Sequence, residues 1–408
     1  MQNKIKQNIS NIWNFEFNNL KPNSTQYVFG LIIVVGSLYV IGEVIFGFSE
    51  IGYSISKFFE STNNAIQPKS GYEKFQYLFP YIWLSLAIGC VLIRFTIIIS
   101  SYFKSKKVLG NNAFNEYLLT YFVSFVISIS TGILFLYIVA GILLLFGIKL
   151  NYGIDVFHNI LEYIKLVVNN NIPSIFQVQN YWLALLLTIV FSGLPAYFIH
   201  WLTHKYRIFW LFLHRSHHSP QFLHPMGSPP GFSFTFFLTI PGGLVSIIVS
   251  KIIYTEPMVM EMILWNTMAY WLEIFNHSII HYKLANSFPL RNLGSLFNGN
   301  GVYHLMHHSA KETDQMINLG GGPFLIWDRV FGTYKKPYEE APPVGLTKMP
   351  KMKLNSFRII FSGIAQMIYE LKMNKDLLTR LKIIFGGIYY VPPITKDFLV
   401  ISYENNKH

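Results

Sequence analysis

The chain has 408 residues, of which 52% are hydrophobic and 13% are charged, and its mean hydropathy is +0.36. This composition favours an integral membrane protein over two or three soluble domains. The net charge of +12 comes from Lys and Arg scattered between apolar segments, which argues against a nucleic-acid-binding stripe and favours an anionic lipid surface as partner. A single cysteine, Cys90, excludes an intrachain disulfide and a multi-cysteine metal site.

Three long apolar stretches occupy the first third of the chain. Residues 27–48 and 77–99 each supply the roughly 20 residues that a helix needs to cross a bilayer, and the first is too long for the apolar core of a signal peptide. Residues 117–148 carry no charge and predict a tilted or extended crossing. In 154–168 apolar residues recur at helical spacing, which predicts an interfacial helix. We expect residues 1–180 to form an N-terminal region of crossings.

The next predicted crossing, residues 181–199, ends directly before His200. Beyond a turn-rich loop, residues 232–250 and 257–276 predict a helical hairpin with a kink or shallow dip at Pro241. Counting these crossings places the amino terminus and all histidine motifs on one side of the membrane. The opposite side receives few of the 32 Lys and Arg residues, which makes the histidine side cytoplasmic. Those few are Lys57, Lys69, Lys74, Lys149 and Lys165.

Ten of the thirteen histidines form four motifs in the order HxxxH, HxxHH, HxxxH, HxxHH. Imidazoles three or four residues apart share one face of a helix, and imidazole is a good ligand for iron, zinc, copper or nickel. One such motif can equally be a set of surface histidines. Four on one predicted membrane face favour a cluster of two metals. The predicted ligands are His200, His204, His214, His217, His218, His277, His281, His304, His307 and His308.

Three further features lie around these motifs. Glu273 falls on the predicted helix face of His277 and His281, where an ionisable side chain at membrane depth either orients a ligand or makes an interhelical hydrogen bond. His224 in the HPMG loop is either a loop histidine or an extra ligand. Residues 336–408 mix apolar and cationic stretches, which predicts a basic tail lying along the membrane surface.

The four motifs, together with HRSHHS and the later WDRVFGTY, resemble the fatty acid hydroxylase superfamily, which includes sterol desaturases and methylsterol oxidases, over residues 181–335. The resemblance implies an all-α fold, a polytopic membrane helical bundle with a cytoplasmic histidine-rich site. It also implies two iron ions held by the ten histidines, for which zinc can substitute in isolated protein. Asn318 in INLGG matches the family's Asn-aromatic-Gly position except that Leu319 replaces the aromatic residue. We expect Asn318, Asp328 and Glu273 to support the ligand histidines without binding the metals themselves.

The resemblance implies an enzyme that hydroxylates or desaturates a lipid, such as a sterol or fatty acyl chain, with O2 and two electrons. Because no cytochrome b5 domain is recognised, we expect a separate electron donor, a reductase with a ferredoxin or a cytochrome b5-like protein. The expected location is the bacterial inner membrane or the endoplasmic reticulum. One alternative is a non-redox zinc protein, a metal transporter or metallohydrolase, although the chain lacks an HExxH motif. The other is a relative that cleaves lipid ethers or removes a carbon.

Overall fold

The protein was analysed as a computed structural model, which describes the central part of the chain and most of its C-terminal third. The described residues are Gly89, Leu92, Ile93, 96–108, Gly110, Asn111, Gly141, Leu144, Leu145, 165–218, 222–223, 235–259, 261–262, Trp265, Phe275, 277–296, 301–346 and 356–393. Within these residues every regular element is a helix, and the one extended pairing is an isolated bridge between Ser309 and Val344. The predicted all-α class therefore holds for the part of the chain that is described.

Helix α6 (Tyr181–Lys205) organises the structure, and among the described residues it alone is long and apolar enough to cross a membrane. The Asn180 side chain caps its first turn by accepting a hydrogen bond from the Leu183 N–H at 3.0 Å. At 1.5 Å per residue the helix is about 38 Å long, which exceeds the roughly 30 Å of bilayer hydrocarbon. The predicted crossing thus continues for six residues beyond residue 199, so His200 and His204 belong to its last turns.

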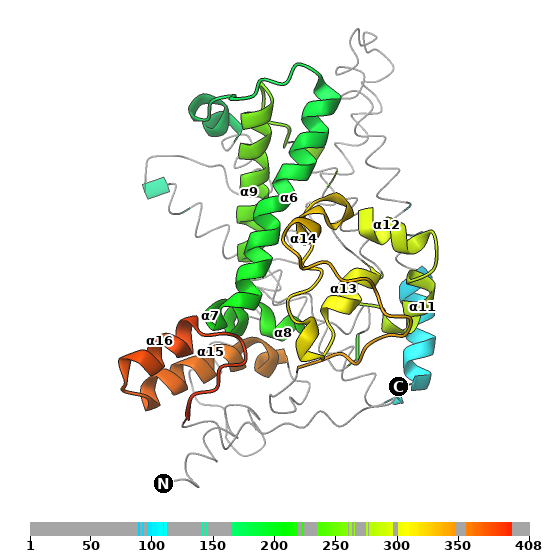
Figure 1. Cartoon of the computed structure of the whole chain (residues 1–408), viewed down its shortest axis with the longest axis vertical. Coiled ribbons are helices and arrows are strands. Elements are labelled where there is room, and N and C mark those ends of the chain that lie inside the picture. Colours follow the sequence, from blue (N-terminus) through cyan, green and yellow to red (C-terminus); the bar gives the residue numbers. More distant parts are fainter. Residues whose placement is uncertain are drawn as a thin grey trace.

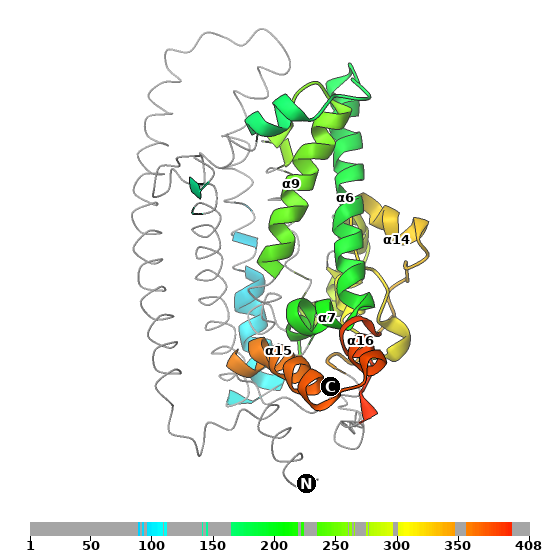
Figure 2. The ribbon, with the colours of Figure 1, turned by 90° about the vertical axis from the view of Figure 1, so that its left-hand side faces the viewer.

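Helix α9 (Thr235–Ile253) runs antiparallel to α6, and the two lie side by side in both ribbon views (Figures 1 and 2). The Val178 N–H, just before α6, donates to the Ile253 carbonyl at the end of α9 at 3.0 Å. Buried Ala184, Ile253 and Met258 fill the contact at this end. α9 corresponds to the first arm of the predicted hairpin, and it continues as a helix through Pro241.

Short helices follow the lower end of α6 (Figure 1), and several of them carry histidines of the later motifs. α7 (Arg207–Phe209), the π-helix η1 (Trp210–His214) and α8 (Arg215–His218) come first. After the second apolar region come η3 (Ile279–His281), α11 (Tyr282–Ala285), α12 (Leu290–Leu296), α13 (Val302–His307), η4 (Glu312–Asp314), η5 (Pro323–Leu325) and α14 (Ile326–Val330). Leu223, Tyr282, Leu305 and Val344 contribute to the core that holds α11 and α13 together.

Helices α15 (Ser356–Met373) and α16 (Leu377–Phe385) pack beneath α7, η1 and α8 (Figure 2). The buried side chains of Trp210 and Leu211 meet Met367, Ile383 and Ile388 there. The segment predicted as a surface tail therefore forms part of the folded core around the motifs. Its association with the membrane stays a prediction.

Several sequence predictions fall on residues outside the described part. They are the crossing 27–48, almost all of 117–148, most of 77–99, 154–168 and 257–276, and the residues Cys90, His224 and Glu273. The polytopic arrangement and the proposed domain boundaries accordingly remain predictions.

Candidate metal centre

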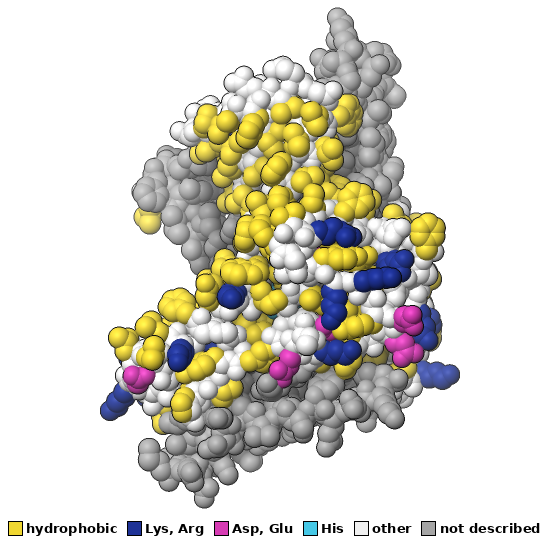
Figure 3. Space-filling view, viewed as in Figure 1, with side chains coloured by type: hydrophobic (Ala, Val, Ile, Leu, Met, Phe, Trp, Pro, Cys, Tyr) yellow, Lys and Arg dark blue, Asp and Glu magenta, His cyan; other side chains and the backbone are white. Residues whose placement is uncertain are grey.

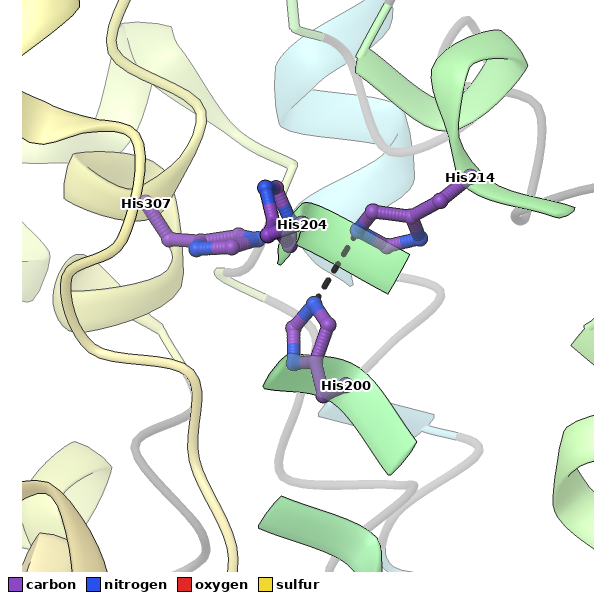
Figure 4. A group of neighbouring side chains, drawn as sticks. All are labelled: His200, His204, His214 and His307. Atoms are coloured by element: carbon purple, nitrogen blue, oxygen red, sulfur yellow. Dashed lines mark hydrogen bonds between the residues drawn. The ribbon is translucent and has the colours of Figure 1, made fainter. Parts of the chain in front are cut away.

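Four histidines from three elements form a first histidine group, His200, His204, His214 and His307, at the lower end of α6 (Figure 4). One ligand nitrogen from each lies within 4.8 Å of the others. The Nε2 atoms of His200 and His214 are 3.0 Å apart, and the His204 and His307 ring centroids are 4.6 Å apart. The rings converge because α6, η1 and α13 all end at this point.

A second histidine group consists of His217, His277, His304 and His308, again with one nitrogen of each within 4.8 Å of the others. The Nε2 atom of His308 lies 3.0 Å from those of His217 and His304 and 3.2 Å from that of His277. Two nitrogens bound to one metal at about 2.1 Å, at right angles, would lie about 3.0 Å apart. The spacing of this group therefore fits a single metal ion.

The donor chemistry of both groups supports the same interpretation. A neutral imidazole carries one N–H, so His200 and His307, whose Nδ1–H groups are bonded to carbonyls, present an Nε2 that can only accept. Both nitrogens of His204 and the Nε2 of His307 are buried without a hydrogen-bond partner among the described residues. Such unpaired buried polar atoms are rare in native proteins unless an ion or water satisfies them. A cation at the centre of each group would do so.

His218 lies between the two groups. Its Nε2 is 3.0 Å from that of His214 in the first group, and its ring stacks on His308 of the second with centroids 4.2 Å apart. The two groups are consequently adjacent, as a centre with two metals requires. Nine of the ten predicted ligands are thus brought together.

His281 is the predicted ligand that the structure keeps apart from both groups. Its Nδ1 lies 2.6 Å from the Ser278 hydroxyl, and its Nε2 lies 3.1 Å from the hydroxyl of Ser100 in the helical segment 96–108. The prediction assumed one continuous helix through His277 and His281. Instead Ser278 has non-helical backbone angles (φ −119°, ψ 73°) and a new 3-10 turn begins at Ile279, so the two rings do not share a face.

Two rings of the first group are oriented by backbone carbonyls of one segment, residues 317–319. The Nδ1 of His200 donates to the Leu319 carbonyl at 2.5 Å, and the Nδ1 of His307 donates to the Ile317 carbonyl at 2.9 Å. A hydrogen bond at Nδ1 fixes the tautomer and leaves Nε2 as the metal-binding nitrogen.

Asn318 stands between those two carbonyls and holds the segment in place. Its amide donates to the Lys335 carbonyl and accepts from the Lys335 N–H, both at 2.9 Å. Its backbone is left-handed, with φ of 47°, a conformation that asparagine tolerates better than most residues. The Asn318 side chain thus holds the backbone whose carbonyls contact His307 of the fourth motif and His200 of the first, and its role in support of the site stays a prediction.

Asp328 anchors the same segment from α14. Its carboxylate accepts hydrogen bonds from the Leu319 and Gly320 N–H groups at 2.8 and 2.9 Å and from the Thr333 hydroxyl at 2.7 Å. Burial raises the pKa of this carboxyl to about 6, while these hydrogen bonds act in the opposite direction. Among the described residues no hydrogen bond joins Asp328 to a histidine, and its connection to the first group runs through the backbone of residues 319–320.

Glycines let this segment approach α6 closely. Gly320, Gly321 and Gly322 all have positive φ, which glycine adopts without strain. A Cβ added at Gly193 of α6 would collide with the Gly322 backbone. The carbonyl of Leu319 can therefore reach His200.

Burial also keeps the imidazoles neutral. The apolar surroundings lower the pKa of the site histidines outside α6, and mutual repulsion between their charged forms lowers it further. Only a neutral imidazole has the free lone pair that a metal needs. The residues concerned are His214, His218, His304, His307 and His308.

Some residues of the site were not predicted from the sequence. Trp210 is buried with its ring 5.1 Å from that of His204 and 5.2 Å from that of His218. Arg215, inside the HRSHH motif, is buried and bonded to Gln366 of α15 at 2.5 Å. A usable signal existed, because Gln366 and Glu370 are polar residues four apart that share one face of α15.

Together these features define a helical protein in which two adjacent all-histidine groups, each able to hold a metal ion, lie at the end of a helix of membrane-spanning length. Residues 185–333, which include all ten motif histidines, Asn318 and Asp328, match the model of the family described as fatty acid hydroxylase. This stretch is therefore a fatty acid hydroxylase family domain. Comparison with curated proteins and with solved structures gave no match.

Proposed function

We propose that the protein is a membrane-bound non-haem di-iron oxygenase that hydroxylates or desaturates a lipid. The observation that carries the proposal is the pair of adjacent four-histidine groups inside a fatty acid hydroxylase domain. Iron is favoured over zinc because an active zinc site needs few histidines and a carboxylate base. Neither histidine group contains a carboxylate.

The surface around α6 supports an integral membrane location with the substrate arriving from the bilayer. Hydrophobic side chains cover the upper part of the molecule over α6 and α9, whereas Lys and Arg gather below them (Figure 3). Exposed apolar residues of α6 include Trp182, Leu186, Phe191 and Phe198. Because α6 ends at the histidine groups, a lipid beside it would reach the site without leaving the membrane. The positive residues below favour a cytoplasmic site in a polytopic protein.

For hydroxylation, the reaction balances as a C–H bond plus O2, two electrons and two protons giving C–OH and water. Bound iron would supply the oxygen activation and single-electron steps, which side chains do not provide. The chain's residues would hold and shield the centre. His200 and His307 donate Nδ1–H to fixed carbonyls and thereby present Nε2, and buried Trp210 limits entry of water. Electrons would come from a separate reductase with a ferredoxin or a cytochrome b5-like protein.

The test is to purify the full chain anaerobically, load it with Fe²⁺ and measure iron per chain. Reductant, a lipid extract and ¹⁸O₂ are then added, and lipids are analysed by mass spectrometry. We expect about two irons per chain, from the two groups, and a lipid that gains one ¹⁸O atom or loses two hydrogens. Protein that holds only zinc, and that leaves every lipid unchanged after loading with iron, would overturn the proposal in favour of a non-redox zinc protein. An aldehyde released from an ether lipid would instead identify the ether-cleaving reaction.

A further inference from the structure

A chain of buried polar groups connects α15 to the helices that carry the first two histidine motifs. Arg207 of α7 and Arg215 of α8 are each only 1% exposed, and Glu370 of α15 is fully buried. Burying two guanidinium groups is costly unless charges and hydrogen bonds compensate them. Glu370, Gln366 and the Ile383 carbonyl, all beyond the fatty acid hydroxylase domain that ends at residue 333, contribute to this compensation.

The contacts run from one arginine to the other through α15. Glu370 forms an ion pair with Arg207 at 2.5 Å, and its Oε1 accepts from the Gln366 amide at 2.8 Å. The Gln366 Oε1 in turn accepts from the Arg215 guanidinium at 2.5 Å. The Arg207 backbone N–H also donates to the Gly386 carbonyl after α16 at 2.9 Å, so both C-terminal helices are attached.

The position of Arg215 gives this network its importance. His214 precedes it and belongs to the first histidine group, while His217 follows two residues later and belongs to the second. Fixing the Arg215 side chain therefore fixes the backbone that delivers one ligand to each group. Among the described residues, only one other short segment supplies ligands to both groups. It is the end of α13 with its C-cap, where His307 belongs to the first group and His308 to the second.

The C-terminal segment also forms a wall of the site. A cavity of about 20 Å³, large enough for one water molecule but not for a lipid, lies against His204, His218 and His307. Ile388 and Tyr389 line its other side, and Ile388 packs in one core with Trp210. The segment after α16 thus forms part of the wall beside three of the site histidines.

We propose that Glu370 is a positioning residue for both histidine groups, acting through Gln366 and the two arginines. The C-terminal helices are accordingly part of the metal centre, although they lie outside the fatty acid hydroxylase domain. This inference rests on the metal-binding role of the two groups and is independent of the reaction they perform.

The experiment uses Co²⁺ as a probe, because its visible absorption reports ligand geometry and its binding needs no turnover. Full-length wild type, Glu370→Gln and the matched control Ile368→Ala, an exposed position on the same helix, are titrated in detergent. We expect Glu370→Gln to bind Co²⁺ about 10- to 100-fold more weakly, with altered absorption bands and unchanged helical circular dichroism. Ile368→Ala should match wild type. Wild-type affinity and spectrum in folded Glu370→Gln would overturn the proposal.

A second pair of variants covers the case in which Glu370→Gln does not fold. Gln366→Leu removes the bond to Arg215 but keeps the Arg207–Glu370 ion pair, and it should weaken Co²⁺ binding; wild-type affinity and spectrum would overturn the proposal. The double variant Gln366→Glu with Glu370→Gln moves the carboxylate one turn toward Arg215 and should bind Co²⁺ more tightly than Gln366→Leu. Cobalt bands that shift as expected without any lipid oxidation would overturn only the proposed reaction. Wild type that binds no Co²⁺ would overturn both.

Discussion

The two histidine groups differ in what fixes their rings. In the first group His200 and His307 are oriented by carbonyls of residues 317–319, a segment held in turn by Asn318 and Asp328. In the second group His304 and His308 lie four residues apart at the end of α13, so the helix itself brings their Nε2 atoms to 3.0 Å. The first group thus depends on a loop remote in sequence from α6, and the second depends more on local geometry. Substitutions far from the ligands should therefore affect the first group more.

The largest effect should come from removing one ligand of each group in turn. His307→Ala deletes a ligand of the first group and His217→Ala one of the second. We expect each variant to lose about one of two metals, because a structural or catalytic site rarely retains its ion with an incomplete ligand set. Lipid oxidation should fall below detection in both, while the protein stays in the membrane. Metal analysis of membrane-extracted protein checks this, and two metals per chain in either variant would contradict the grouping.

A smaller and selective loss is expected for Asp328→Ala. The variant removes the acceptor for the Leu319 and Gly320 N–H groups, so the carbonyl that orients His200 loses its support. The metal affinity of the first group should fall about 10- to 100-fold, which is the usual cost of replacing a residue that orients a metal ligand. The metal affinity of the second group should be unchanged. A competition titration with a chelator would show one weakened and one normal site. Asp376→Asn, at the exposed cap of α16, serves as control, and equal weakening of both sites would refute the distinction.

The smallest effect should follow from Gly193→Ala. The added methyl group collides with the Gly322 backbone and pushes the 317–322 segment away from α6. Overpacking of this kind costs about 1 to 3 kcal/mol, so the thermal midpoint should drop and the first group should bind metal somewhat more weakly. Gly243→Ala in α9 is the matched control, since its Cβ meets nothing within 4 Å. It should be neutral or stabilise by up to about 1 kcal/mol. If Gly193→Ala and Gly243→Ala had the same thermal midpoint, the close approach of residues 317–322 to α6 would not be what limits stability.

The spacing of histidines predicted most of the site, because helical periodicity converts sequence distance directly into a shared face. That logic succeeded for His200 with His204 and for His304 with His308. It did not apply to His277 with His281, because Ser278 between them has non-helical backbone angles. Periodicity carries no information about such a break.

Long-range contacts were harder to foresee. The sequence identified Asn318 and Asp328 through a resemblance, but only the folded chain shows that they hold carbonyls against His200 and His307. Similarly, the apolar and cationic pattern after residue 336 indicated a membrane-surface tail, whereas Gln366 and Glu370 face inward to meet two arginines. An amphipathic pattern shows that a helix has two faces and does not show which partner covers the apolar one.

The π-turn at η1 sets the direction in which the later ligands point. The Arg215 N–H donates to the Trp210 carbonyl five residues earlier, so this hydrogen-bonded turn holds one residue more than a turn of α-helix. If the same residues took α-helical bonding, every later residue would rotate by about 100° relative to α6. His214 would turn away from the first group, and His217 from the second, in one event. Substitutions within η1 that favour α-helical bonding should thus disturb both groups together.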